Sequence, residues 1–292
     1  MSAVPDKKGD RDAVNATKEE SIIAEQARLH ERGKQTITDG EYPLRTIKCT
    51  IRFGGLIAVN ELDMSVRREE IYGLIGPNGA GKTTIFNLLT GVYKPTSGEI
   101  YFQRQRIDGL RSYEISRRGV SRTFQNIRLF PSMSVLENVM TACHRHACQN
   151  LLDAVLRLPR FERDERDHRE FSMELLEIFD LARFKDEGGT SLPYGNQRRL
   201  EIVRALATRP SLLLLDEPAA GMNPSEQEDL MRLIQQIRDK FKLTILLVEH
   251  NMKVVMGVCE RIQVVDYGKS IALGVPEQIK NDPKVIEAYL GD

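Results

Sequence analysis

The sequence predicts an α/β fold built on an open sheet whose central strands are buried. Two continuous apolar runs, "SLLLLDEP" and "LTILLVEH", are typical of buried parallel strands, and the amphipathic segment between them, "PSEQEDLMRLIQQIRDKF", has the spacing of a helix. Upstream, "EEIYGLIG" leads through a glycine-rich turn into the helix-like "KTTIFNLLTG". Buried strands that alternate with helices favour an open α/β sheet.

Three parts of the chain differ in composition. Residues 1–44 form a polar N-terminal extension of mixed charge, with one predicted helix from Thr17, where "TKEE" fits a capping box. Short β-type runs, "TIKCTIRF" and "IAVNELDMSV", begin at Thr46 and open the main domain, residues 45–292. A stretch rich in Leu, Glu and Arg, from about Val135 to Phe184, is helical in character. We therefore expect a helical subdomain inserted at about residues 126–210.

Composition excludes several classes of protein. The chain has 292 residues, 41% of them hydrophobic, so it should fold around a core, and Lys plus Arg and Asp plus Glu both total 42, which does not favour nucleic acid as a partner. Its apolar runs are shorter than the roughly 18 residues of a membrane span, and its N-terminus lacks the apolar stretch of a secretion signal. Four scattered cysteines indicate reduced thiols. These features predict a cytoplasmic location.

The segment "GPNGAGKTT" matches the phosphate-binding pattern G-x-x-x-x-G-K-[ST] and lies between a predicted strand and a predicted helix. Glycines let successive backbone N–H groups close around phosphates, and the helix N-terminus adds its positive end. Lys82 is expected to reach the β- and γ-oxygens, and Thr83 to ligate Mg²⁺. The predicted nucleotide-binding residues of this loop are Gly76, Pro77, Asn78, Gly79, Ala80, Gly81, Lys82, Thr83 and Thr84.

Polar residues follow other predicted strands. Asp216 and Glu217 end the run "LLLLDEP", where Asp216 is placed to hold the Mg²⁺ shell and Glu217 to polarise an attacking water. Gln125 in "SRTFQN" and His250 in "LLVEHN" each follow a β-type segment. Both are therefore predicted at the carboxyl ends of strands, where open α/β sheets bind ligands. Taken alone, either would more often be an ordinary polar residue.

The order and spacing of these motifs resemble an ATP-binding cassette (ABC) transporter ATPase. The resemblance covers about residues 46–292 and includes "LPYGNQRRLEIVRAL", "AAGMN" and "VEH". It implies a P-loop NTPase core with an N-terminal antiparallel β subdomain and an inserted helical subdomain. Segments such as "RFGGLIAVN", "YGNQRRLEI" and the ending "GVPEQIKNDPKVIEAYLGD" are similar to the LivG type of branched-chain amino acid importer ATPase.

The resemblance also implies roles for single residues. Phe53 in "IRFGG" lies where the family places the aromatic ring that stacks on adenine. Gln125 is similar to the lid-loop glutamine that joins the Mg²⁺ shell and senses the membrane subunit. Glu217 is similar to the catalytic base and His250 to the switch histidine that contacts the γ-phosphate. The implied cofactors are ATP and Mg²⁺, with Thr83, Gln125 and Asp216 as the implied Mg²⁺ ligands.

The family signature, usually L-S-G-G-Q, is altered in this chain. In the family it points at the γ-phosphate held by the other ATPase subunit, and the corresponding residues are Leu192, Pro193, Tyr194, Gly195 and Asn196. Pro193 replaces the serine and offers neither a hydroxyl nor a backbone N–H, and a hydrogen bond to a charged oxygen is typically worth about 1.5–3 kcal/mol. Gly195 still permits close approach, and the helix keeps its positive N-terminus. We expect Pro193 to weaken the contact without abolishing it.

The resemblance implies a peripheral subunit on the cytoplasmic face of the inner membrane, attached only through a permease. Its implied partners are two permease subunits, a second ATPase subunit or a second copy of this chain, and a periplasmic substrate-binding protein. A sibling importer for urea, amides or other amino acids would share nearly every motif. A lipopolysaccharide-export ATPase is disfavoured by "RTFQNIRLF" and the extra helical segment around residues 151–169. A soluble ABC protein is disfavoured by the single cassette.

Two further clusters have simpler interpretations. The run "ACHRHAC" places Cys143, His144, His146 and Cys148 close together in sequence. On a helix these side chains would point in two directions roughly 100° apart, so a metal site is not expected. The run "FERDERDHRE" carries charges of both signs and predicts a solvated helix face.

Overall fold

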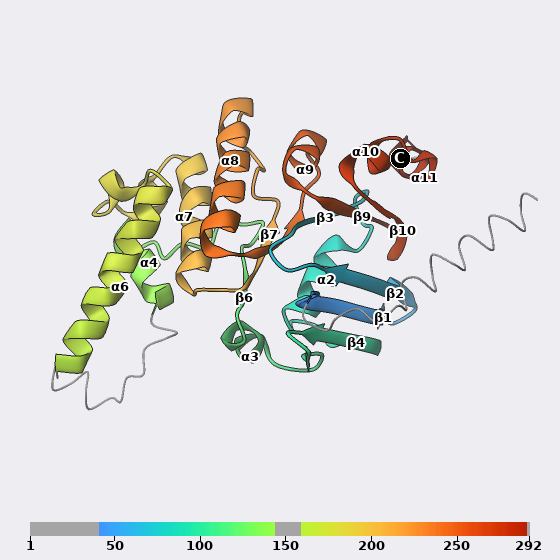
Figure 1. Ribbon diagram of the computed structural model, residues 1–292, viewed down its shortest axis with the longest axis horizontal. Coiled ribbons are helices and arrows are strands. Elements are labelled where there is room, and N and C mark those ends of the chain that lie inside the picture. The colour runs from blue at the N-terminus through green and yellow to red at the C-terminus, as the bar shows by residue number, and fades with distance from the viewer. Residues whose placement is uncertain (1–40, 144–158, 291–292) are drawn as a thin grey trace, which may run out of the picture. The chain divides into compact units, whose positions relative to one another are not determined.

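The computed structural model describes residues 41–143 and 159–290, and a six-stranded sheet forms its centre (Figure 1). The strand order is β10-β9-β3-β8-β7-β6. The strands are β3 (Ile71–Ile75), β6 (Val120–Arg122), β7 (Leu212–Asp216), β8 (Thr244–Val248), β9 (Arg261–Asp266) and β10 (Lys269–Gly274). All neighbours pair in parallel except β10 with β9. The predicted open α/β sheet is confirmed.

A second sheet has four strands in the order β2-β1-β4-β5. Its strands are β1 (Leu44–Phe53), β2 (Leu56–Val66), β4 (Ser97–Phe102) and β5 (Gln105–Arg106). All three pairings are antiparallel. This is the antiparallel β subdomain that the family resemblance implies.

Alternate residues of the central strands belong to different hydrophobic cores. In β7, Leu212 and Leu214 pack in the core that holds Phe86 of α2 (Lys82–Leu89) and the inner face of the antiparallel sheet. Leu213 and Leu215 pack in the other core, with the helices on the opposite face. Successive side chains of a strand point to opposite faces of the sheet, so a strand buried on both faces must be apolar throughout. This explains the continuous apolar runs of the sequence.

Helices cover both faces of the six-stranded sheet (Figure 1). Outside the inserted region, the described helices are α2, α3 (Ser112–Arg117), α8 (Pro224–Phe241), α9 (Met252–Val258), α10 (Pro276–Lys280) and α11 (Pro283–Leu290). Helix α8 spans the predicted segment because its start is capped: Asn223 Oδ1 accepts from Glu226 N at 3.0 Å, and Asn223 N donates to Glu226 Oε2 at 2.9 Å. Its C-cap, Lys242, has a left-handed backbone with φ of 52°.

The inserted region contains α4 (Val135–Cys143), α6 (Pro159–Ile178) and α7 (Tyr194–Ala207), with short 3₁₀ turns at Ala182–Phe184 and Gly189–Ser191. The stretch predicted as helical from Val135 to Phe184 is thus divided in the described residues. Helix α6 ends at Ile178, just before Asp180 takes a left-handed φ of 56°. The run "FERDERDHRE" lies on α6 and is mostly exposed, although His168 is buried.

Several predictions lie partly or wholly outside the described residues. They concern the helix from Thr17 and, in the cysteine–histidine run, His144, His146 and Cys148. Among the described residues no group of three potential metal-ligating side chains is found. Cys49, Cys143 and Cys259 are buried free thiols. None of the described helices is long and apolar enough to cross a bilayer.

Candidate functional site

The strands β3, β8, β7 and β6 lie side by side and parallel, so their carboxyl ends meet along one edge of the sheet. The phosphate loop follows β3, while Asp216 and Glu217 stand at the end of β7. Gln125 comes shortly after β6, and His250 shortly after β8. The sheet therefore gathers residues from four separate parts of the chain at the edge where open α/β sheets bind ligands.

Two positions of the phosphate loop have a backbone conformation that glycine adopts more easily than other residues. Gly79 and Gly81 have left-handed φ values of 78° and 100°, and a Cβ on Gly81 would lie 2.6 Å from the Ala58 carbonyl oxygen. Helix α2 begins directly after the loop, at Lys82. A helix N-terminus preceded by such a loop is an anion site, because several N–H groups point the same way. The chain's backbone therefore fits the phosphates of a nucleotide.

Lys82 bends back over this loop. Its Nζ donates to the carbonyl oxygens of Gly76 at 2.6 Å and Pro77 at 2.8 Å, and the side chain is largely buried. Burial lowers the pKa of Lys82, while the carboxylates of Glu217 and Asp216 act in the opposite direction. An ammonium group has three donors, so one remains to meet an anion in the loop.

Glu217 contacts two of the other predicted residues. Gln125 Nε2 donates to Glu217 Oε2 at 2.9 Å, and His250 Nδ1 lies 3.8 Å from Glu217 Oε1. Glu217 has a left-handed φ of 47°, which turns the chain at the end of β7. The Glu217 side chain is 20% exposed and that of His250 62%, so water reaches both. The arrangement suits a general base beside a bound phosphate.

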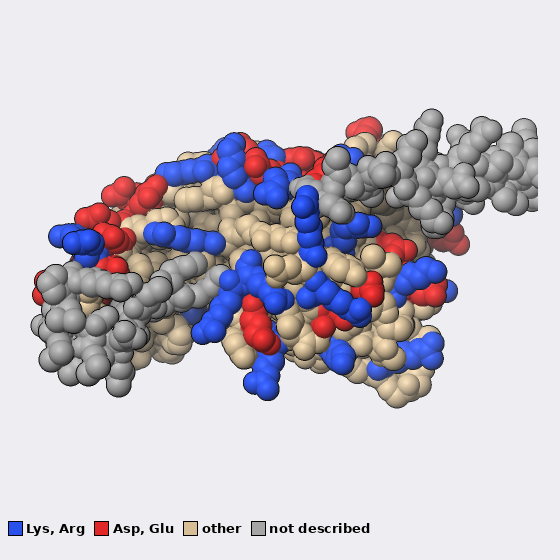
Figure 2. All heavy atoms as spheres, turned by 60° about the horizontal axis from the view of Figure 1, so that its bottom comes forward, with Lys and Arg blue, Asp and Glu red and all other residues tan. Residues whose placement is uncertain are grey.

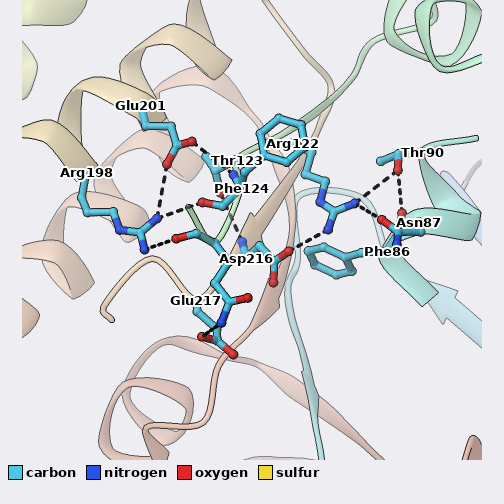
Figure 3. A network of polar contacts seen from close by, with 11 residues as sticks. Phe86, Asn87, Thr90, Arg122, Thr123, Phe124, Arg198, Glu201, Asp216 and Glu217 are labelled. Atoms are coloured by element: carbon cyan, nitrogen blue, oxygen red, sulfur yellow. Dashed lines mark hydrogen bonds and ion pairs between the residues drawn. The ribbon is translucent and has the colours of Figure 1, made fainter. Parts of the chain in front are cut away.

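Asp216 has a partner that the sequence did not reveal. Arg122 Nη2 donates to Asp216 Oδ2 at 2.7 Å, and both side chains are less than a tenth exposed (Figure 3). Arg122 Nη1 also donates to Asn87 Oδ1 at 2.7 Å, and the guanidinium carbon lies 5.3 Å from the centre of the Phe86 ring. The signal was present only as an arginine in "SRTFQN"; the carboxylate it pairs with is 94 residues away.

The predicted ligand residues are chemically suited to Mg²⁺. Carboxylate and hydroxyl oxygens are the ligands that this ion prefers, and Asp216 keeps a second carboxylate oxygen beside the one that Arg122 binds. Thr83 lies in the first turn of α2 and is exposed. The Mg²⁺ roles of Thr83, Gln125 and Asp216 stay predictions.

Glu249 is a buried residue that the sequence reading did not single out. It accepts from Ala219 N at 2.7 Å and from His250 N at 3.2 Å, so it ties the segment after β7 to the segment after β8. Burial raises the pKa of its carboxyl group, and the hydrogen bonds from Ala219 and Asn251 oppose that rise. The sequence signal was its position directly after the apolar run "LTILLV" and next to His250. A carboxylate that is buried at such a position needs hydrogen-bond partners.

The signature segment opens α7. Pro193 is the N-cap and its carbonyl oxygen accepts from the N–H groups of Asn196 and Gln197, at 2.9 and 3.0 Å. Pro193 and Tyr194 are exposed, while Leu192 and Gly195 are buried. No side chain caps this helix start, so the N–H groups of its first turn are not bound by a capping side chain and could meet an anion. That role itself stays a prediction.

Phe53 lies at the end of β1 and is 44% exposed. Its ring meets the ring of Tyr93 edge to face, with centroids 5.2 Å apart. An exposed ring held by a neighbour is suited to stacking on a planar base. Its role as the adenine platform stays a prediction.

The sequence matches two protein families. Residues 59–220 match the family described as "ABC transporter", and residues 269–292 match "Branched-chain amino acid ATP-binding cassette transporter". The first match covers the phosphate loop, the signature and the end of β7.

Individual proteins agree with these matches. The high-affinity branched-chain amino acid transport ATP-binding protein BraF of Pseudomonas aeruginosa is 49% identical over 243 residues, which span 83% of this chain and 95% of BraF. The corresponding protein LivG of Escherichia coli is 48% identical over 242 residues, with the same coverage of 83% and 95%. In the crystal structure of MJ1267 in its ADP conformation, an ATP-binding cassette of an ABC transporter, the fold matches with a TM-score of 0.75 at 30% identity, over 86% of this chain and 99% of MJ1267. The chain therefore belongs to the ABC transporter family, as one of its ATP-hydrolysing cassettes.

Proposed function

We propose that this chain is the ATP-hydrolysing subunit of an importer of branched-chain amino acids, held at the cytoplasmic face of the inner membrane by a permease. The contact of Glu217 with both Gln125 and His250 beside the phosphate loop supports ATP hydrolysis. The match of residues 269–292 to a branched-chain amino acid cassette, together with the names of BraF and LivG, supports the transported solute.

The residues of the site divide the reaction between them. The phosphate loop and Lys82 bind the phosphates of ATP and stabilise the charge that develops there. Glu217 accepts a proton from a water whose oxygen attacks the γ-phosphorus, and the bond from that phosphorus to the bridging oxygen breaks, which yields ADP and phosphate. His250, next to Glu217, would contact the γ-phosphate. Asp216, Thr83 and Gln125 would hold Mg²⁺, which would neutralise charge at the phosphates.

Each ATP site needs a second ATPase subunit. Pro193 and Tyr194 are exposed at the start of α7, where this helix end is suited to meet the phosphates bound by another subunit. Two subunits arranged head to tail would complete two sites. The second subunit is another ABC ATPase or a second copy of this chain.

A groove of about 330 Å³ is suited to a segment of the permease. It lies between α3 and β6 on one side and α4 and α7 on the other, and it is lined in part by Ile115, Phe124 and Arg204. Phe124 precedes Gln125, so a segment in the groove would touch the loop that carries the glutamine. Lys and Arg side chains gather on the face that Figure 2 brings forward, the side of α3, and Arg111, Arg117 and Arg118 are exposed there. A permease segment with carboxylates would complement this face.

The test is co-purification of the chain with its permease and binding protein, followed by ATPase assays with the binding protein loaded with leucine or with urea. We expect stimulation by the leucine-loaded protein and none in Glu217→Gln. Stimulation by urea alone would transfer the chain to the sibling importers. Absence of any membrane partner would contradict the importer and favour a soluble ABC protein.

A further inference from the structure

Two buried side chains on α7 hold the backbone of the lid loop, which we define as residues 123–130. Arg198 Nη1 donates to the Phe124 carbonyl oxygen at 2.8 Å, and Arg198 Nη2 donates to the Gln125 carbonyl oxygen. Phe124 N donates to Glu201 Oε1 at 3.3 Å. The two side chains also pair with each other at 3.4 Å (Figure 3). Backbone groups of two consecutive loop residues are thus bound by one helix.

The Arg198–Glu201 ion pair has a role beyond stabilising the fold. The side chains of Arg198 and Glu201 are 3% and 6% exposed. A buried ion pair is often no more stabilising than apolar residues of similar volume, because removing both charges from water is costly. What an apolar pair could not provide is a set of directed hydrogen bonds to a loop backbone. The pair therefore fixes the position of the lid loop relative to α7.

The other end of the lid loop reaches the catalytic carboxylate. The side chain of Gln125 donates to Glu217, and Arg122, just before the loop, pairs with Asp216. The loop thus lies between α7 and the end of β7. A shift of α7 that carries the backbone of Gln125 must lengthen or shorten the Gln125–Glu217 contact, since a hydrogen bond tolerates only a few tenths of an ångström.

The same helix carries the signature at its start. Arg198 Nε lies 3.2 Å from the Tyr194 hydroxyl, and its guanidinium stands over the Tyr194 ring at 5.5 Å. The Tyr194 ring also packs against Gly221, where an added Cβ would lie 2.9 Å from the ring. One residue, Arg198, therefore contacts both the signature and the lid loop.

We propose that Arg198 and Glu201 are positioning residues that link the two ATP sites of an ATPase dimer. When the signature of this subunit engages ATP on the other subunit, α7 moves and carries the lid loop with it. Gln125 is then displaced relative to Glu217. The base of one site responds in this way to the occupancy of the other. The inference rests on the ATPase activity proposed above and not on the transported solute.

The test uses the double variant Arg198→Met/Glu201→Met, which removes both buried charges together and so avoids leaving one unpaired. The matched control is Arg199→Met, because Arg199 is the neighbouring residue on α7 and pairs at 3.5 Å with Asp229. Hydrogen exchange of the peptide 120–128 is measured on the ATPase dimer, formed by this chain alone or with its second ATPase subunit, with and without Mg²⁺ and a non-hydrolysable ATP analogue.

In the wild type and in Arg199→Met, we expect the analogue to change exchange in this peptide. In the double variant, we expect exchange about tenfold faster before nucleotide is added, because the Phe124 N–H has lost its acceptor, and no further response to the analogue. A double variant that responds as Arg199→Met does would overturn the proposal. So would a wild-type peptide that ignores the analogue.

A kinetic cycle tests whether the pair acts through Gln125. Added to Gln125→Ala, the double substitution should change neither kcat nor the KM for ATP any further. If the double substitution lowered kcat by the same factor in Gln125→Ala as in the wild type, the proposal would be contradicted. Arg198→Lys, which can reach one carbonyl, should restore part of the lost kcat. These measurements involve no permease, so they stand even if the solute proves not to be a branched-chain amino acid.

Discussion

The phosphate loop and the signature segment each place a glycine at the start of a helix, yet they are built differently. The phosphate loop closes on its own chain: Lys82 binds two loop carbonyls, and Gly81 passes over the Ala58 carbonyl. The signature opens outward, with Pro193 and Tyr194 exposed at the start of α7. In the proposed function, the first is a complete binding element, whereas the second contributes half of a site shared with another subunit. A local motif can therefore specify the first, while the second depends on where α7 is held.

The largest effect on ATP hydrolysis is expected from removing the general base, Glu217. Glu217→Gln keeps the shape of the side chain but removes the base, so we expect hydrolysis to fall by about 10²–10⁴-fold, the usual range for general base catalysis. Binding of a fluorescent ATP analogue should remain within about twofold. The control is Glu228→Gln, an exposed carboxylate that pairs with Lys253 at 2.7 Å. Wild-type hydrolysis by Glu217→Gln would remove Glu217 from the role of base.

Two glycine substitutions test the phosphate loop and the signature segment independently. In Gly81→Ala the new Cβ meets a backbone oxygen at 2.6 Å in a left-handed conformation, a strain on the order of 1–3 kcal/mol. The isolated subunit should therefore bind ATP at least about tenfold more weakly. In Gly195→Ala the Cβ meets Glu226 Oε1 at 2.9 Å, the end of a flexible side chain. ATP binding by the isolated subunit should be retained, and only the ATPase activity of the dimer should fall.

Titration calorimetry of ATP measures both binding predictions, and melting temperature checks that each variant folds. Equal losses of binding in Gly81→Ala and Gly195→Ala would show that the two regions are not distinct in the way proposed.

A smaller effect concerns the proline of the signature. Pro193→Ser adds a hydroxyl and an N–H at the helix start, so we expect the ATPase activity of the assembled transporter to rise, by about tenfold for a gain near the lower end of a charged hydrogen bond. ATP binding by the isolated subunit should not change. An unchanged ATPase rate would mean that the proline costs the contact nothing.

The smallest effect is expected at the base platform. Phe53→Ala removes a stacking surface worth about 0.5–1.5 kcal/mol, so ATP affinity should fall by about two- to tenfold. The phosphates are held elsewhere, so affinity for inorganic triphosphate should be unaffected. Competition binding with both ligands gives the comparison. A loss of affinity for both would indicate that Phe53 supports the loop instead of the base.

How far the sequence anticipates the structure depends on how local each feature is. The span of α8 was predictable because Asn223, Pro224 and Glu226 cap it from adjacent positions. The apolar runs of β7 and β8 identified central strands, since burial on both faces leaves a continuous signal. The stretch from Val135 to Phe184 was less clear, because periodicity does not show where a helix such as α6 ends.

The sequence by itself determined the phosphate loop, the central strands and the set of polar residues at their ends, because each depends on neighbours along the chain. Only the tertiary structure decided which of them meet. Arg122 reaches Asp216 across 94 residues, and Arg198 reaches Phe124 across 74. Such pairs depend on the order of strands in the sheet and on the packing of α7. Side-chain identity alone does not encode them, since an arginine can serve any carboxylate or carbonyl that the fold brings within reach.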